Sequence, residues 1–269
     1  MKVSVIVTTY NEEKHIRHLL DSLRRQEHLH AVILVDAAST DRTVERARRV
    51  PDVPLQVVVQ KCSRGAGRNL GAAQATGDAL AFIDGDCIAN SRWLEALVAA
   101  SDPNVIVAGR TELLGYWAFT KLHRVELPHR GQDTTWPSCN LLYPRDLFQR
   151  LGGFDEHFVT AEDIDLNFRA VDAGAKIRSA PAGIVYARAR DSITGFLRQA
   201  YWNGFGRKQL TQKHGRLWHE YKITDMIRLQ GGSFWGLLRM GFGFIGYMDA
   251  KLGRRPCFCV SCLRPNPFQ

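Results

Sequence analysis

The stretch VSVIVTT at residues 3–9 decides how the rest of the chain is read, because it is apolar and rich in β-branched residues without polar alternation. Such a run is typical of a strand that helices cover on both faces, as in a parallel sheet. Apolar residues at helical spacing follow between Ile16 and Leu23. The chain therefore begins with a strand, a turn and a helix.

The same strand and helix unit recurs downstream of residue 30. Apolar runs predict three further strands, at residues 31–36, 55–60 and 79–84. Helical patterns separate them, the last being the small-residue run RGAGRNLGAAQAT. This alternation predicts an α/β fold with an open, mostly parallel sheet, and ligands bind such sheets at the carboxyl ends of the strands. Asn11, Asp36 and Asp84 fall at such ends.

Length and composition limit the alternatives. With 269 residues, 45% of them apolar and 23% charged, the chain has the composition of an ordinary globular protein. These values exclude a disordered chain, a coiled coil and a multi-span membrane protein. The order of predicted elements divides the chain into residues 1–110, residues 111–195 and a helical C-terminal extension at residues 196–269.

The net charge of +9 belongs to the C-terminal third. Residues 176–269 hold 16 Lys and Arg against four Asp and Glu, whereas residues 1–175 carry a net −3. This asymmetry indicates a polyanionic partner, either an anionic membrane surface or nucleic acid, although a solvated basic face explains it equally well. No nucleic-acid-binding motif occurs, so nucleic acid is disfavoured. Residues 233–248 are strongly apolar but interrupted by Arg239 and four glycines, which predicts an interfacial or packed helix rather than a span.

Cysteine usage and the N-terminus bear on the compartment. Six scattered cysteines are too few for a disulfide framework in a chain of this length, and the opening residues do not have the pattern of a signal peptide. A cytoplasmic protein, peripheral on the inner face of the cell membrane, is the expectation. The tail cysteines Cys257, Cys259 and Cys262 could bind zinc or be acylated, or do neither.

Two acidic clusters carry the candidate chemistry. Asp84-Gly85-Asp86 follows a buried strand, where two carboxylates are costly unless a cation such as Mg²⁺ or Mn²⁺ holds them against phosphate, although an Asp-rich turn has the same spacing. Glu162, Asp163 and Asp165 lie at a predicted helix N-terminus, where they either supply a general base or merely cap the helix. The glycines of RGAGRNLG fit either phosphate binding or close packing of the helix on the sheet.

Taken in order, these segments resemble the family-2 glycosyltransferases. SVIVTTYNEE resembles the first strand and base-contacting loop of that family, and VDAASTDRT resembles its VDDGSTDGT segment. RGAGRNLGAAQATGD resembles the helix before its metal strand, FIDGDC its DxD motif, and GGFDEHFVTAEDIDL its acceptor-side loop and ED motif. The resemblance covers about residues 1–190 and implies the GT-A fold.

The resemblance also implies roles for individual residues. The residues implied to bind the donor are Thr9, Tyr10, Asn11, Glu12, Asp36, Arg68, Asp84, Gly85 and Asp86. Within this set, Asp84 and Asp86 are implied to hold a divalent cation, Mn²⁺ or Mg²⁺. Asp163 is implied to be the base that deprotonates the acceptor hydroxyl, with Glu162 beside it.

The implied reaction is inverting transfer of a single sugar from a nucleoside diphosphate donor to a hydroxyl acceptor. A UDP-sugar is favoured over a GDP-sugar, and a lipid-linked or cell-envelope acceptor suits the basic C-terminal third. The segment RQAYW only partly resembles the QxxRW motif of polymerising members, which argues against a polymerase.

Three alanines depart from the family pattern. Ala37 and Ala38 replace its second acidic residue and its glycine, and Ala187 stands where many members have a metal-binding histidine. These departures leave an alternative open, namely a degenerate member that binds a nucleotide-sugar or glycan without turnover.

Overall fold

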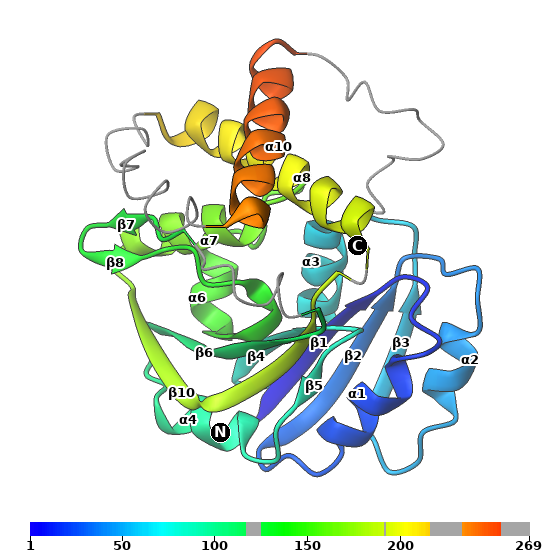
Figure 1. Ribbon diagram of the computed structural model, residues 1–269. Coiled ribbons are helices and arrows are strands. Elements are labelled where there is room, and N and C mark those ends of the chain that lie inside the picture. Colours follow the sequence, from blue (N-terminus) through cyan, green and yellow to red (C-terminus); the bar gives the residue numbers. More distant parts are fainter. Residues whose placement is uncertain (117–124, 191, 216–232, 254–269) are drawn as a thin grey trace.

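The computed structural model describes residues 1–116, 125–190, 192–215 and 233–253. An eight-stranded mixed sheet in the order β3-β2-β1-β4-β9-β6-β10-β5 forms the centre, with helices on both faces (Figure 1). Its strands are β1 (Val3–Thr9), β2 (Leu29–Asp36), β3 (Leu55–Val59), β4 (Ala79–Asp84), β5 (Ile88–Ala89), β6 (Val105–Leu114), β9 (Leu141–Pro144) and β10 (Lys176–Arg188). Two short strands, β7 (Pro128–His129) and β8 (Gln132–Asp133), pair separately.

The helices divide between the two faces of the sheet. Their bounds are α1 (Ile16–Leu23), α2 (Thr43–Arg48), α3 (Arg64–Gln74), α4 (Trp93–Ala99), α6 (Arg145–Arg150), α7 (Glu162–Asp172), α8 (Ile193–His214) and α10 (Phe234–Lys251), with a short 3-10 helix at Ser138–Asn140. Apolar residues of α1, α2 and α4 pack on one face, and those of α3, α6 and α7 pack on the other. The result is a three-layer α/β/α arrangement.

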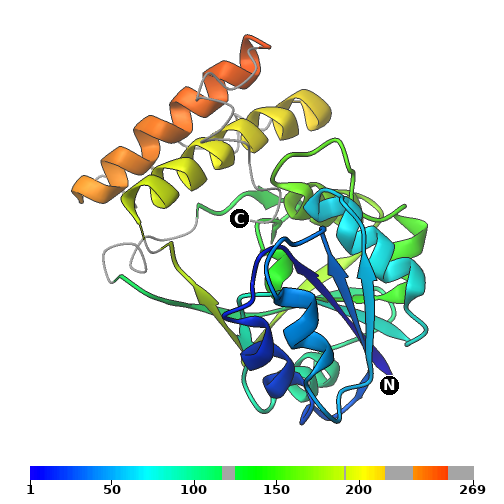
Figure 2. The same ribbon diagram turned by 90° about the vertical axis from the view of Figure 1, so that its right-hand side faces the viewer.

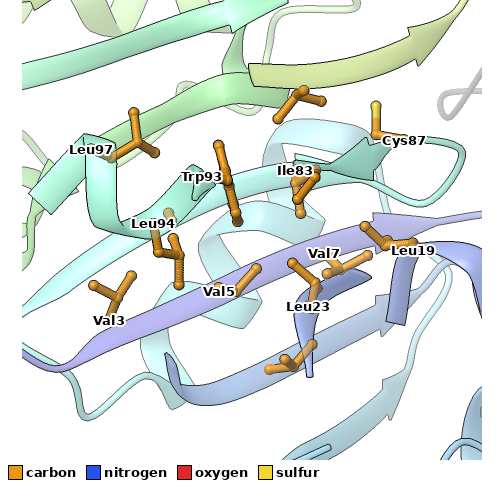
Figure 3. Close-up of a cluster of buried hydrophobic side chains, with 14 of the residues drawn as sticks. Val3, Val5, Val7, Leu19, Leu23, Ile83, Cys87, Trp93, Leu94 and Leu97 are labelled. Atoms are coloured by element: carbon orange, nitrogen blue, oxygen red, sulfur yellow. The ribbon is translucent and has the colours of Figure 1, made fainter. Parts of the chain in front are cut away.

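Strand β1 shows why these residues form a central strand. Val3, Val5 and Val7 point into the core beneath α1 and α4 (Figure 3), while Ile6 points into the core on the opposite face. All seven residues of the strand are buried, which matches a run without polar alternation. Parallel ladders join β1 to both β2 and β4, so the ends of these three strands lie along one edge of the sheet.

The predicted α/β fold with a mostly parallel sheet is confirmed. The sequence pattern missed β9, which lies antiparallel between β4 and β6. Its four apolar residues are too few to display a period, and they precede a helix at once. Of the helical extension predicted at residues 196–269, the structure describes α8 (Ile193–His214) and α10 (Phe234–Lys251), whereas residues 216–232 and the cysteine tail lie outside the described residues.

Helices α8 and α10 lie side by side beyond the end of the sheet and run in the same direction (Figure 2), with Phe196 against Trp235 near their N-termini and Lys208 over Tyr247 further along. Their backbones approach so closely that a Cβ on Gly204 would overlap the carbonyl oxygen of Gly243, and one on Gly246 would overlap that of Tyr201. The end of α8 is held to α7 by Asp165, whose carboxylate contacts His214 at 2.7 Å and Lys213 at 2.8 Å. Among the described helices, none has both the length and the hydropathy needed to span a membrane.

Candidate active site

The loops after β1 and β2 are joined by hydrogen bonds around Asn11 and Asp36. The amide of Asn11 donates to Ser39 Oγ at 2.8 Å, and its side-chain oxygen accepts from the amide of Thr40 at 2.8 Å. The fully buried Asp36 accepts from the amide of Ser39 at 2.7 Å and from its hydroxyl at 2.5 Å. Both residues therefore lie at the strand-end edge, as the sequence predicts, and they fix the shape of the loops there.

Two of the alanines that depart from the family pattern, Ala37 and Ala38, lie in the turn after β2. Ala38 adopts a φ of 65°, in the left-handed region that glycine occupies without strain. For alanine this conformation costs about 1 kcal/mol. Ala37 is buried, and its amide donates to the carbonyl oxygen of Thr9 at 2.9 Å. Ala38 thus takes up a backbone conformation that a glycine at this position would adopt without strain.

The Asp84-Gly85-Asp86 turn packs against Thr9 at the end of β1. A Cβ on Gly85 would come within 2.6 Å of Thr9 Oγ1, so only glycine fits between the two aspartates. The Thr9 hydroxyl is buried and has no hydrogen-bond partner among the residues that the structure describes. Burial raises the pKa of Asp86, and the neighbouring charge of Asp84 raises it further. The negative charge of Asp84 therefore disfavours ionisation of Asp86 at this turn, and a bound cation would favour it.

A divalent cation fits this donor set. Hard cations such as Mg²⁺ take carboxylate oxygens and usually complete their shell with water and substrate phosphate rather than with a full protein cage. The described residues contain no cluster of three or more His, Cys, Asp or Glu side chains suited to a metal ion, which agrees with alanine at position 187. If Asp84 and Asp86 hold such an ion, its remaining ligands would come from the substrate and water.

Arg68 lies buried beneath the site and joins its two acidic clusters. One guanidinium nitrogen contacts Asp84 Oδ1 at 2.8 Å, and another contacts Glu162 Oε1 at 2.6 Å. Burial alone lowers the pKa of Arg68, but the charges of Asp84 and Glu162 outweigh it, so the arginine stays charged. The DGD turn and the ED pair, far apart in the sequence, therefore meet around one guanidinium.

Helix α3 positions Arg68 through the glycines of RGAGRNLG. A Cβ on Gly71 would lie 2.5 Å from Ile6 Cγ2, and one on Gly67 would lie 3.2 Å from Thr8 Cγ2. The helix thus packs directly on β1. Asn69 of the same helix holds the following loop, because its side chain bonds both the amide and the carbonyl of Phe154, each at 2.8 Å. Close packing therefore accounts for Gly67 and Gly71.

Asp163 lies at the N-terminus of α7 and is held from two sides. Its Oδ2 accepts from the amide of Ser138 at 3.1 Å, and its Oδ1 accepts from the amide of Ile164 at 2.8 Å. Burial raises the pKa of Asp163, and the charge of Glu162 adds to that rise, whereas the charge of Arg68 opposes it. Ala161, the residue directly before α7, has a left-handed φ of 68°, which sets the direction in which the helix begins.

Glu12 belongs to the same electrostatic neighbourhood. Burial raises the pKa of Glu12, a hydrogen bond from His15 Nδ1 at 2.8 Å opposes this, and the charge of Asp86 raises it again. Tyr10 is half-buried at the end of β1. The predicted residues therefore gather at one edge of the sheet, with Arg68, Asp84 and Glu162 in direct contact.

The sequence pattern missed two residues of this region. Ser138, which orients Asp163, lies in an irregular stretch before β9 that carries no periodic signal. Arg190, which follows β10, was read only as part of the basic C-terminal third. Neither position could be placed without knowing that β9 and β10 lie near the DGD turn.

Comparisons with known proteins identify the family. The sequence matches the profile of Glycosyl transferase family 2 over residues 4–155, more than half of the chain, and that of Glycosyl transferase family group 2 over residues 110–260. Glycosyltransferase AglE of Haloferax volcanii is 32% identical over 191 residues, which are 64% of this chain and 62% of the relative. Pre-mycofactocin glycosyltransferase of Mycobacterium tuberculosis is 28% identical over 261 residues, 90% of this chain and 53% of the relative.

Two solved structures share the fold. TarS of S. aureus in complex with UDP-GlcNAc aligns with a TM-score of 0.57 at 20% identity, over 95% of this chain and 93% of that one. The mannosyltransferase PcManGT of Pyrobaculum calidifontis in complex with GDP-Man and Mn²⁺ aligns with a TM-score of 0.64 at 20% identity. The alignment covers 94% of this chain and 76% of that one.

The α/β sheet with helices on both faces thus has the GT-A fold. The chain belongs to glycosyltransferase family 2. It spans between half and two thirds of the length of the two curated relatives described above.

Proposed function

We propose that the protein is a metal-dependent, inverting glycosyltransferase that moves one sugar from a UDP-sugar to a hydroxyl acceptor. The observation that carries the proposal is the contact of Arg68 with both Asp84 and Glu162. Because one guanidinium contacts both the DGD turn and the ED pair, the contact supports a shared site in which the first would bind the donor and the second the acceptor. A donor held by the first cluster would present its anomeric carbon to an acceptor held by the second.

The donor half of the site would work through charge. Asp84 and Asp86 would hold a divalent cation, which supplies charge stabilisation for the departing diphosphate. Arg68 fixes Asp84 from below, so that the carboxylate faces the donor in one orientation. The loops around Asn11 and Asp36 would bind the nucleoside.

The acceptor half would work through Asp163 as the general base. Its carboxylate takes the proton of the acceptor hydroxyl while the acceptor oxygen bonds to the anomeric carbon. The bond from that carbon to the diphosphate oxygen breaks in the same step, and the nucleoside diphosphate leaves with the electron pair. Attack from the face opposite the leaving group inverts the configuration. The raised pKa of Asp163 makes it a stronger base than an exposed aspartate.

The donor assignment predicts metal-dependent nucleotide binding. Titration calorimetry of UDP and GDP, each with and without Mn²⁺, is expected to show Mn²⁺-dependent binding of UDP. Asp86→Ala should weaken that binding by at least about 10- to 100-fold, because it removes one of two protein carboxylates.

Asp78→Ala is the matched control, since Asp78 is exposed and precedes β4 at the opposite end of that strand. It should bind UDP like the wild type. Binding of GDP alone would overturn the choice of base, and binding of neither nucleotide would overturn the proposed function.

We also propose that helix α10 rests on an anionic membrane, where a lipid-linked acceptor would be presented. Opposite its glycine-rich face, α10 exposes an apolar stripe in which Phe234 is 68% exposed, Leu237 53% and Phe244 64%. Residues 176–269 carry a net +12. An apolar stripe on a basic segment is the pattern of a helix lying in the headgroup region.

The membrane contact predicts sedimentation with anionic vesicles. The full chain should sediment with phosphatidylserine-containing vesicles, and Phe234→Ser with Phe244→Ser should release most of it because the buried apolar area is lost. Val59→Ser is the control, since Val59 is 52% exposed on edge strand β3. Equal sedimentation of the double variant and the wild type would sink this assignment.

A further inference from the structure

The segment after β10 is brought to the DGD turn by strand pairing. Strand β10 runs antiparallel to β5, with Tyr186 opposite Ile88 and Val185 opposite Ala89. Because β5 begins two residues after Asp86, the chain beyond Tyr186 passes alongside the turn as it leaves the sheet. Arg190 lies on this outgoing segment, just before helix α8.

Arg190 has an unusual environment for an arginine. It is half-buried, and the charges that bear on it come from Asp86, Asp84 and Glu12 on one side and from Arg64 on the other. Burial lowers the pKa of Arg190, the charge of Asp86 opposes that effect, and the charge of Arg64 adds to it. Arg68 meets its carboxylates within 3 Å, whereas Arg190 makes no hydrogen bond or ion pair with any described residue.

A half-buried guanidinium without a partner is costly unless an anion binds it. The DGD turn brings two carboxylates together, and the diphosphate of a bound donor would add further negative charge, so a cationic side chain beside the turn would be stabilising. Arg190 follows Ala187 by three residues. A guanidinium there would face the diphosphate from the side of β10 and bind it with paired hydrogen bonds.

We propose that Arg190 binds the terminal phosphate of the donor diphosphate and stabilises the charge of the leaving group together with the cation held by Asp84 and Asp86. This inference rests on the proposed function. It means that a positively charged side chain of the protein, in addition to the metal ion, stabilises the leaving diphosphate. Its contribution depends on the second phosphate of the nucleotide, and that dependence separates it from a contact with the nucleoside.

The test is titration calorimetry of UDP and UMP in Mn²⁺ with Arg190→Ala, Arg190→Lys and the wild type. Arg190→Ala should weaken UDP binding by about 10- to 100-fold, since it removes charge-assisted hydrogen bonds, and should change UMP binding by less than about threefold. Arg190→Lys should fall between, because lysine keeps the charge without the paired geometry. Arg188→Ala removes the same charge from an exposed position of the same segment and should bind UDP like the wild type.

The outcomes separate this inference from the proposed function. If the wild type binds UDP and Arg190→Ala binds it equally well, the inference is overturned and the proposed function stands. Equal losses for UDP and UMP would also overturn it, because the contact would not involve the terminal phosphate. If the wild type binds no nucleotide, both fail. Unchanged melting temperatures in the variants would show that the comparison is made between folded proteins.

Discussion

Replacing Asp163 with asparagine is expected to lower the rate of sugar transfer by about 10³- to 10⁴-fold, the upper range for loss of a positioned general base. Asparagine is nearly isosteric, and its side-chain oxygen can still accept a hydrogen bond from Ser138 or Ile164. It cannot take up a proton at neutral pH. The substitution therefore removes the proton transfer while leaving the site in place, and UDP binding should stay within about threefold of the wild type.

The pH dependence of the wild type gives the same assignment a second readout. Asp163 acts in its ionised form, so transfer should be present above its pKa and lost as the pH falls through it. Burial and the charge of Glu162 raise that pKa above the ordinary 3.8, so activity should disappear at a higher pH than for an exposed aspartate. A profile of kcat measured from about pH 4 to about pH 8 would show the loss of activity at low pH, because raised carboxyl pKa values fall in this interval.

Asp146→Asn is the control for the Asp163 variant, because Asp146 is an exposed carboxylate in the first turn of α6. It should leave transfer unchanged. Transfer by Asp163→Asn at the wild-type rate would show that another group takes the proton. A wild type that binds UDP but transfers nothing to a panel of acceptors, lipid-linked ones included, would favour the degenerate, non-catalytic alternative.

The donor half of the fold could be predicted because its signals are local. The apolar composition of runs such as residues 3–9 and 79–84 is enough to predict that they form buried strands. Because these strands are parallel, their carboxyl ends are predicted to lie at the same end of the sheet. The expected positions of Asn11, Asp36 and Asp84 are confirmed for the same reason. Strand β9 could not be predicted, since a four-residue apolar run shows no period that distinguishes it from a loop or from the start of a helix.

The partners of the charged residues could not be predicted, because they depend on the order of strands in the sheet. The family resemblance implies that Glu162 stands beside the general base Asp163. It implies that Arg68 binds the donor, at its nucleobase or its phosphates. The structure places these two side chains against each other, 94 positions apart in the sequence. Likewise, the alternatives for Asp165 were a base or a cap, and the structure shows it holding the end of α8. The periodicity of a sequence predicts which residues are buried, but it does not predict which side chains they contact.

The buried contacts of Arg68 predict the largest loss of stability in the molecule. Arg68→Met should lower the free energy of unfolding by about 3–5 kcal/mol, the cost typical of removing one partner from a buried ion pair. The side chain of Glu162 is 3% exposed and that of Asp84 is 32% exposed, so the substitution leaves one half-buried carboxylate and one buried carboxylate that keeps only the longer contact with Arg64 at 3.8 Å. Urea-induced unfolding at pH 7 measures the difference.

The double variant Arg68→Met, Glu162→Gln shows whether that loss comes from stranded charge or from lost packing. If charge dominates, neutralising Glu162 should recover a large part of the loss, and the double variant should be more stable than Arg68→Met alone. A double variant less stable than both single variants would contradict this account. Arg92→Met is the matched control, because Arg92 also makes a two-pronged contact with a carboxylate, that of Glu95, at 2.7 and 2.8 Å, but at an exposed position. Since water already solvates both charges there, its loss should leave the unfolding curve nearly unchanged.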